Sequence, residues 1–346
     1  MAAPKKINLA LQGGGAHGAI TWGVLDRLLE DERLVFESIS GASAGAVNAV
    51  ALAYGLHLGG RDGGRAKLNE LWRAVSEVGV FCSPVKRTPL DIALDSYTLD
   101  NSLTYQIFDA FTRTFSPYQF NPFNFNPLKD ILGRCIDFDD LRDCKRTRLY
   151  LSATNVRSGK VRIFRTHDVN VDVVAASASL PFLYQAAEID GEHYWDGGYL
   201  GNPALFPFFY ETNSRDIVIV HVNPIERPEV PHAAPDIMNR VNEISFNSSL
   251  LSELRAISFV QKLLDESWLK DEYRDRLKNI HIHSVRSDEA LVELSIASKF
   301  NVEWAFLSDL KEKGRQIADN WIKNTFEDIG KRSTVDLRSM FMSKEV

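Results

Sequence analysis

The sequence of 346 residues is 45% hydrophobic and 25% charged, with a formal net charge of −6. A chain of this length and composition can bury a sizeable core, and its negative charge argues against a dedicated nucleic-acid-binding protein. The three cysteines form no C-x-x-C pair, so neither a disulfide framework nor a zinc site is expected. We see no signal peptide and no apolar run of the ~20 residues that a membrane helix needs. We therefore expect a cytoplasmic protein and leave open transient contact with a membrane surface.

Short apolar runs alternate with helical patterns near the start of the chain. Residues 7–12 (INLALQ) and 35–40 (VFESIS) are predicted strands, because both are short, apolar and followed by glycine-containing turns. Helices are predicted after them, at 19–34, 46–58 and 66–79. This alternation predicts an α/β fold with parallel strands.

Residues 84–135 differ in composition, and we interpret them as an aromatic-rich cap or insertion. Their first half has the pattern of an amphipathic helix. Their second half is interrupted by Pro117, Pro122 and Pro127, so no regular structure is expected there. These aromatic residues either pack over the core or line a site for a long apolar substrate. The candidate acyl-binding residues are Phe108, Phe111, Phe115, Phe120 and Phe123.

The remaining chain predicts further strands and a helical tail. Strands are expected within 148–164, at EHYW (192–195), at DIVIVHVNP (216–224) and at NIHIHSV (279–285), and helices within 235–278 and 303–327. We find no internal repeat and no linker. We therefore expect one catalytic domain over 1–230, with a mainly helical extension over 231–346 packed on it. The role of that extension and the oligomeric state stay open.

Two glycine-rich motifs follow the first two predicted strands. Gly13-x-Gly15-x-x-Gly18 matches a dinucleotide-binding fingerprint, and Glu37 has roughly the separation of a ribose-binding acid. The same loop could instead offer backbone N–H groups to the oxyanion that forms during acyl transfer. Gly41-x-Ser43-x-Gly45 fits an elbow that carries a serine nucleophile between a strand and a helix. Together the two motifs favour acyl transfer over cofactor binding.

A serine nucleophile needs a base. The strongest candidate is Asp196, which follows a predicted strand and precedes two glycines in YWDGGYLGN. His232 lies in a predicted loop and remains possible as the base. The other histidines near the motifs or in predicted strands are His17, His193, His221, His281 and His283.

Four segments, GGGAHG, GASAG, ASASLP and DGGYLGNP, resemble in this order the sequence blocks of patatin-like phospholipases, over residues 7–225. The resemblance implies a three-layer α/β/α sandwich with a mainly parallel sheet, related to α/β-hydrolases. It also implies a Ser–Asp dyad without histidine. The sequence shows no cluster of histidine and carboxylate ligands, so we expect no metal, and we expect no cofactor. Carried over, the nucleophile is Ser43 and the base is Asp196. The oxyanion hole is formed by the backbone amides of Gly13, Gly14 and Gly15.

The expected function is hydrolysis of a lipid ester, with a phospholipid or lysophospholipid as substrate. One position departs from the family, because His17 stands where Arg or Lys is frequent, which leaves the head-group preference open. A depolymerase or esterase acting on a polyester or acylglycerol is an alternative within the same chemistry. A dinucleotide-binding oxidoreductase and a non-catalytic lipid-binding protein are alternatives of other classes.

Overall fold

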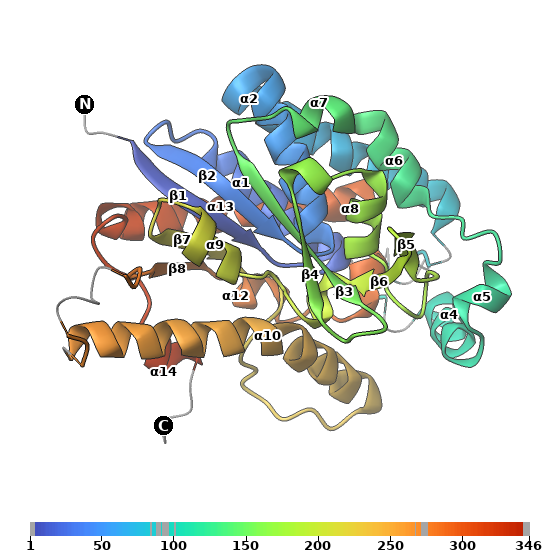
Figure 1. Cartoon of the computed structure of the whole chain (residues 1–346). Helices are drawn as coiled ribbons and strands as arrows, with labels where there is room; N and C mark the ends of the chain where they lie inside the picture. The colour runs from blue at the N-terminus through green and yellow to red at the C-terminus, as the bar shows by residue number, and fades with distance from the viewer. Residues whose placement is uncertain are drawn as a thin grey trace.

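A computed structural model of the protein describes residues 4–83, 85–87, 91, 97–99, 102–266, 268–270 and 276–341 (Figure 1). An eight-stranded sheet runs through it in the order β5-β6-β3-β2-β1-β7-β8, with β4 paired with β3. The strands are β1 (Lys5–Leu11), β2 (Leu34–Gly41), β3 (Arg148–Asn155), β4 (Val161–Arg165), β5 (Ala187–Ile189), β6 (Glu192–Asp196), β7 (Asp216–Val220) and β8 (His281–Val285).

The centre of the sheet is parallel. Strand β1 pairs in parallel with β2 and β7, β2 with β3, and β7 with β8. The pairs of β3 with β4 and β6, and of β5 with β6, are antiparallel. The carboxyl ends of β1, β2 and β7 therefore meet at one edge of the sheet, where parallel α/β proteins place their ligand sites.

Helices cover both faces of the sheet. Alternate side chains of a strand point to opposite faces, and in β7 Val218 and Val220 join one hydrophobic cluster while Ile217 and Ile219 join another. The first cluster includes α1 (Gly18–Leu28), α2 (Ala44–Cys82), α6 (Pro127–Cys135), α8 (Val171–Ser177) and α13 (Trp304–Thr325). The second includes α9 (Phe206–Glu211), α10 (Ala234–Asp265) and α14 (Leu337–Phe341). The predicted three-layer α/β/α architecture is confirmed (Figure 1).

The segment after residue 230 contributes to this core. Strand β8 extends the sheet beyond β7, and α13 packs along α1, where Trp304 contacts Trp22 with ring centroids 5.9 Å apart. A Cβ at Gly314 would lie only 2.2 Å from the carbonyl oxygen of Ile20. The two helices therefore touch backbone to backbone at this point, so α13 is an integral part of the helical layer.

The cap differs from its prediction. Helix α4 (Leu103–Thr114) has the expected amphipathic position, but α5 (Pro117–Phe120) and α6 follow it where no regular structure was expected. Pro117 and Pro127 begin these two helices, and proline is well tolerated at the first helical position because its missing N–H would have no intrahelical partner there. Residues 84, 88–90, 92–96 and 100–101 of the predicted insertion lie outside the described residues.

The predicted helices at 46–58 and 66–79 are joined in α2, which departs from helical geometry only at Gly59 and Gly60. The remaining helices are α7 (Phe138–Arg142) and α12 (Asp288–Leu291), with short 3-10 helices that include η1 (Gly15–His17), η3 (Gly197–Tyr199) and η4 (Ala297–Phe300). In the part of the chain that the structure describes, no helix combines the length and the apolar character needed to cross a membrane.

Candidate active site

Ser43 lies in a tight turn between β2 and α2. Its backbone has φ 53° and ψ −127°, a conformation that costs a non-glycine residue about 1–3 kcal/mol and persists only where the surrounding structure enforces it. The surroundings are close here: a Cβ at Gly45 would lie 2.1 Å from the carbonyl oxygen of Leu11, and one at Gly41 would lie 2.6 Å from that of Gly45. The turn therefore presses against the end of β1 and presents Ser43 to the adjacent cavity.

Asp196 is the last residue of β6, and its side chain is fully buried. Its Oδ1 accepts the amide of Gly198 at 2.7 Å, while Oδ2 has no hydrogen-bond partner among the described residues. Burial raises the pKa of Asp196 to about 7, partly offset by the Gly198 amide and the Ser43 hydroxyl. The hydroxyl is thus near the carboxyl group without forming a well-aligned hydrogen bond, as is common for catalytic pairs before substrate binds.

The ASASLP segment holds these two residues in place. The amide of Ser43 donates to both the carbonyl oxygen and the Oγ of Ser177, each at 3.1 Å. The amide of Asp196 donates to the carbonyl oxygen of Ser179 at 2.9 Å. The carbonyl oxygen of Asp196 in turn accepts the hydroxyl of Thr154 at 2.8 Å. The third motif therefore aligns the backbones on which the serine and the carboxyl group are carried.

The glycine loop lies against the serine turn. A Cβ at Gly13 would be 2.5 Å from the Cβ of Ser43, so only glycine fits at that position. Gly14 and Gly15 line the same cavity as Ser43, and no described residue accepts a hydrogen bond from their amides. The amide of Gly13 already donates to Oδ1 of Asn202 at 2.7 Å. Of the three predicted oxyanion donors, the Gly13 amide is therefore already engaged by Asn202, whereas the amides of Gly14 and Gly15 have no acceptor among the described residues.

Sequence reasoning missed the asparagine and glutamine side chains that anchor this loop. Asn223 donates from Nδ2 to the carbonyl oxygen of Gly13 at 2.7 Å, so the Gly13 peptide is held by Asn202 on one side and Asn223 on the other. Gln12 Nε2 donates to Asn247 at 3.0 Å, and its Oε1 accepts the amide of Asn223 at 3.1 Å. Asn202 lies within the DGGYLGNP segment, and Asn223 lies at the end of the predicted strand 216–224. Both positions could have been found by asking which polar residues meet the loop at the sheet edge.

A cavity of about 570 Å³ adjoins Ser43, and its wall is mainly apolar. Helices α4 and α5 project beside the sheet (Figure 1), and Phe108 and Phe120 from them line the cavity. Phe125, which sequence reasoning did not single out, lines it as well. The other predicted acyl-binding residues are exposed and do not appear on the cavity wall: Phe111, Phe115 and Phe123, the last of them 95% exposed.

The histidines do not complete the site. His281 Nδ1 and His283 Nε2 both contact Oδ1 of Asp216, at 3.2 and 3.0 Å, at the start of β7. His221 contacts Ser284 at 3.1 Å, and His232 is exposed. Among the described residues, none of the histidines forms a hydrogen bond with Ser43 or Asp196.

The acidic residue of the dinucleotide interpretation, Glu37, lies away from the glycine loop. Glu37 lies inside β2, and its carboxylate accepts the amides of Asn213 and Ser214, each at 2.8 Å. These residues precede β7, whereas the glycine loop follows the carboxyl end of β1. Because β1 and β7 run parallel, Glu37 lies toward the opposite edge of the sheet from the loop.

His17 and Lys299 lie behind and beside the loop. Burial, together with the charges of Lys299 and Arg227, holds the pKa of His17 well below its usual range, and its Nε2 contacts Ser298 Oγ at 2.8 Å. His17 is therefore neutral near pH 7. Lys299 reaches the cavity wall from η4. A charged side chain thus lines the cavity, but it comes from the C-terminal part of the chain.

The sequence profile described as patatin-like phospholipase matches residues 9–209, more than half of the chain. The protein belongs to this family. The match confirms the resemblance inferred from the four sequence blocks, and it spans the serine elbow, the glycine loop and Asp196. Among curated proteins, no sequence matches this one.

Solved structures resemble this chain at low sequence identity. VipD from Legionella pneumophila is 16% identical, with a TM-score of 0.42 over 93% of this chain and 67% of that chain. ExoU from the type III secretion system of Pseudomonas aeruginosa, in complex with SpcU, is 14% identical, with a TM-score of 0.33 over 93% of this chain and 53% of that chain. This chain therefore spans about two thirds of VipD and about half of ExoU.

Proposed function

We propose that the protein is a serine hydrolase that cleaves a carboxylic ester bond of a lipid, with Ser43 as nucleophile and Asp196 as base. The observation that carries this proposal is the position of both side chains together: Ser43 is on a strained elbow at a large apolar cavity, next to a buried carboxyl group with an unpartnered oxygen. Membership of the patatin-like phospholipase family supports the same chemistry.

The reaction follows from these positions. The carboxylate of Asp196 removes the proton of the Ser43 hydroxyl as Oγ attacks the ester carbonyl carbon. The carbonyl oxygen becomes an oxyanion and accepts hydrogen bonds from the amides of Gly14 and Gly15, each worth ~3–4 kcal/mol in the transition state. Asp196 then returns the proton to the departing alcohol. Water, deprotonated by the same carboxylate, releases the fatty acid from the acyl-enzyme and restores Ser43.

The surroundings of the cavity support a lipid as substrate. A cavity with a mainly apolar wall suits an acyl chain. Exposed apolar side chains also gather in the cap and near residue 182, and we propose that this surface contacts the lipid aggregate transiently. They include Leu103, Ile107, Phe123, Phe125 and Phe182.

Fatty-acid release by the purified wild type, Ser43→Ala and Asp196→Asn tests the proposal. The substrates are diacyl phospholipid vesicles, lysophospholipid, and matched short-chain and long-chain simple esters. We expect release from the lipids by the wild type and a loss of at least ~1,000-fold in either variant, because each removes one member of a unit that acts together. Circular dichroism shows whether the variants are folded.

Each result has a distinct meaning. Activity of the wild type on simple esters alone keeps the dyad and redirects the search to acylglycerols or polyesters. Undiminished turnover by Ser43→Ala contradicts the proposal outright. Labelling of the wild type, but not of Ser43→Ala, by a serine-reactive phosphonate shows directly that the hydroxyl is nucleophilic and excludes an inert lipid-binding site.

A further inference from the structure

Lys299 is the charged side chain of the cavity that holds Ser43: among the described residues lining it, the others are apolar, aromatic, glycine, hydroxyl-bearing or amide-bearing. Its Nζ donates to Oδ1 of Asn223 and to Oδ1 of Asn242, each at 3.0 Å. Asn223 is the same residue that holds the carbonyl oxygen of Gly13. The ammonium group is therefore hydrogen-bonded to a residue that also holds the glycine loop in place.

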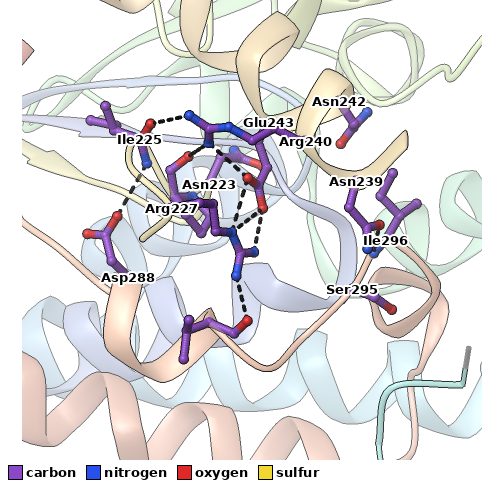
Figure 2. Close-up of polar contacts among 12 residues, drawn as sticks. Asn223, Ile225, Arg227, Asn239, Arg240, Asn242, Glu243, Asp288, Ser295 and Ile296 are labelled. Carbon is purple, nitrogen blue, oxygen red and sulfur yellow. Dashed lines mark hydrogen bonds and ion pairs between the residues drawn. The ribbon is translucent and has the colours of Figure 1, made fainter. Parts of the chain in front are cut away.

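The carboxylate nearest in this network is already neutralised. Figure 2 shows Glu243 between the guanidinium groups of Arg227 and Arg240. The distances are 2.5 Å from Arg227 Nη2 to Oε1 and 3.1 Å from Arg240 Nη1 to Oε2. In the described part of the chain, Lys299 has no carboxylate within 4.0 Å. Lys299, Arg227, Arg240 and Glu243 are thus three cations and one carboxylate, and the further carboxyl group whose charge acts on Lys299 is that of Asp196 in the site itself.

Such a group is costly to bury without an anion. An ammonium group has three N–H donors, and the two asparagines account for two of those of Lys299. Burial lowers the pKa of Lys299 to about 8, so it remains mostly charged at neutral pH. Lys299 is partly buried at the wall of a mainly apolar cavity, and such a cation favours an anionic ligand because the lower local dielectric strengthens the attraction.

The position of Lys299 relative to the reacting groups suggests which anion. A Cβ at Gly15 would lie 2.6 Å from the carbonyl oxygen of Lys299 and 3.1 Å from its Cβ, so Lys299 is in contact with the oxyanion loop. An ester carbonyl bound to that loop would lie close to the ammonium group. In a glycerophospholipid only a few covalent bonds separate an ester carbonyl from the phosphate.

We propose that Lys299 is the specificity-determining residue of this site and binds the phosphate group of a phospholipid whose ester carbonyl is at Ser43. This inference rests on the proposed hydrolase function. Three elements distant in sequence build the subsite: Asn223 after β7, Asn242 on α10 and Lys299 on η4. His17, neutral and hydrogen-bonded to Ser298, does not supply this charge.

Turnover by Lys299→Met, which keeps the length of the side chain but removes its charge, tests the proposal. The matched control is Lys313→Met, which removes a lysine that pairs with Asp309 on α13 away from the cavity. The substrates are dihexanoyl phosphatidylcholine and dihexanoylglycerol, both below their aggregation concentrations. We expect kcat/KM of Lys299→Met for the phospholipid to fall about 10- to 100-fold, because a charge-assisted hydrogen bond is lost. For the diacylglycerol we expect a clearly smaller loss: Lys299 also acts on Asp196 and, through Asn223, on the glycine loop, and these effects are shared by both substrates. The ratio of kcat/KM for the phospholipid over the diacylglycerol therefore isolates the phosphate contact.

Equal losses on the two substrates would overturn the proposal and assign Lys299 to positioning of the oxyanion loop. An unchanged kcat/KM for the phospholipid would overturn it as well. Lys313→Met is expected to match the wild type on both substrates.

A binding measurement keeps this inference separate from the proposed hydrolysis. Calorimetric titration of Ser43→Ala and of Ser43→Ala/Lys299→Met with dihexanoyl phosphatidylcholine requires no turnover. We expect affinity to fall at least about tenfold in the double variant, even if the wild type proves to cleave nothing. Equal affinities would contradict the inference. Inorganic phosphate is the third ligand, and binding of it as tight as that of the phospholipid would make this a site for free phosphate and overturn the lipid assignment.

Discussion

Asp196 combines full burial with a proposed role as proton acceptor, and each property affects the other. A carboxyl group in water is too weak a base to remove a proton from serine efficiently near neutral pH. Burial raises the pKa of Asp196 to about 7, which brings its basicity near the pH at which general-base catalysis is most effective. The charges around it act the other way, because Lys299 lowers the pKa of Asp196. Burial thus raises the pKa of Asp196, whereas its hydrogen bonds and Lys299 lower it.

This pKa predicts how activity depends on pH. Asp196 accepts a proton only as a carboxylate, so kcat/KM for a neutral monomeric ester should rise with pH and level off above an apparent pKa near 7. At pH 5 we expect about 100-fold less activity than at pH 8, because roughly 1% of the groups are then ionised. Initial rates between pH 4.5 and 9 check this. An inflection near pH 4 would indicate a solvated carboxyl group and contradict the burial argument.

The same burial should destabilise the native protein at neutral pH. The folded protein holds the proton of Asp196 up to about pH 7, whereas the unfolded chain releases it near 3.8. Its stabilising contribution is therefore complete below pH 3.8 and is lost as the pH rises to 7. Above pH 7, we expect the free energy of unfolding of Asp196→Asn, measured in urea, to exceed that of the wild type by about 2–4 kcal/mol, because asparagine carries no charge.

The advantage of Asp196→Asn should shrink toward pH 5. Ser43→Ala is the control, because it retains the carboxyl group and should lose stability with rising pH as the wild type does, with a slightly higher pKa of Asp196 since the Ser43 hydroxyl lowers it. A constant difference between Asp196→Asn and the wild type across this range would show that the carboxyl group does not change its ionisation on folding.

The elements of the sheet were predictable from sequence because each is a short apolar run between turns, and the site strands β1, β2 and β6 lie close to their predicted positions. The cap was less predictable. Proline was read as a residue that interrupts structure, whereas Pro117 and Pro127 begin helices α5 and α6. Whether a proline interrupts or begins a helix depends on the residues that follow it. A proline in the interior of a helix breaks it, whereas a proline at the first helical position is well tolerated.

The cap helices predict which aromatic residues affect chain length. Phe120 lines the cavity, whereas Phe123 is almost fully exposed. With monomeric esters, Phe120→Ala should lower the ratio of kcat/KM for long over short acyl chains by about tenfold, because apolar contact with the distal carbons is lost. Phe123→Ala is the matched control and should leave this ratio unchanged. On phospholipid vesicles, Phe123→Ala should instead weaken binding, as flotation of the protein with vesicles would show.

A response to Phe123→Ala in the monomeric assay would place that side chain on the acyl path. No response to Phe120→Ala would make the cavity wall near α5 irrelevant to chain selection.

The proposed nucleophile and base come from local motifs, but the residues that contact them could not be found in that way. Asn202 and Asn223 contact Gly13 across separations of 189 and 210 residues. Lys299 reaches the same loop from still further along the chain. A single sequence indicates which residues follow a strand, but it does not state which strands are neighbours, and these contacts exist only once the strand order is known. For the same reason, only the structure could show that two of five predicted phenylalanines line the cavity.

At the scale of the whole molecule, the segment after residue 230 was expected as a mainly helical extension packed on the catalytic domain, with a strand at 279–285. Its contacts predict that the fold depends on it. Gly314→Ala would place a Cβ 2.2 Å from the carbonyl oxygen of Ile20, so α1 and α13 must separate. We expect the free energy of unfolding to fall by about 2–3 kcal/mol, measured by urea denaturation. Gly133→Ala is the control, because a Cβ there meets nothing within 4 Å and alanine favours the helix by about 1 kcal/mol.

A loss of stability equal in both variants would contradict the close contact between the two helices. A loss confined to Gly314→Ala would support it and make truncation at residue 230 incompatible with a folded catalytic domain.

The packing of the last long helix on the first has a consequence for the order of events during synthesis. The ribosome makes the serine elbow and the glycine loop within the first 45 residues, but α13, which completes the helical layer over α1, ends only at Thr325. Lys299, which contacts the glycine loop, also emerges late. A nascent chain therefore carries the proposed nucleophile long before the residues around it are complete. The proposed hydrolytic activity should arise only after α13 has been synthesised and has packed on α1.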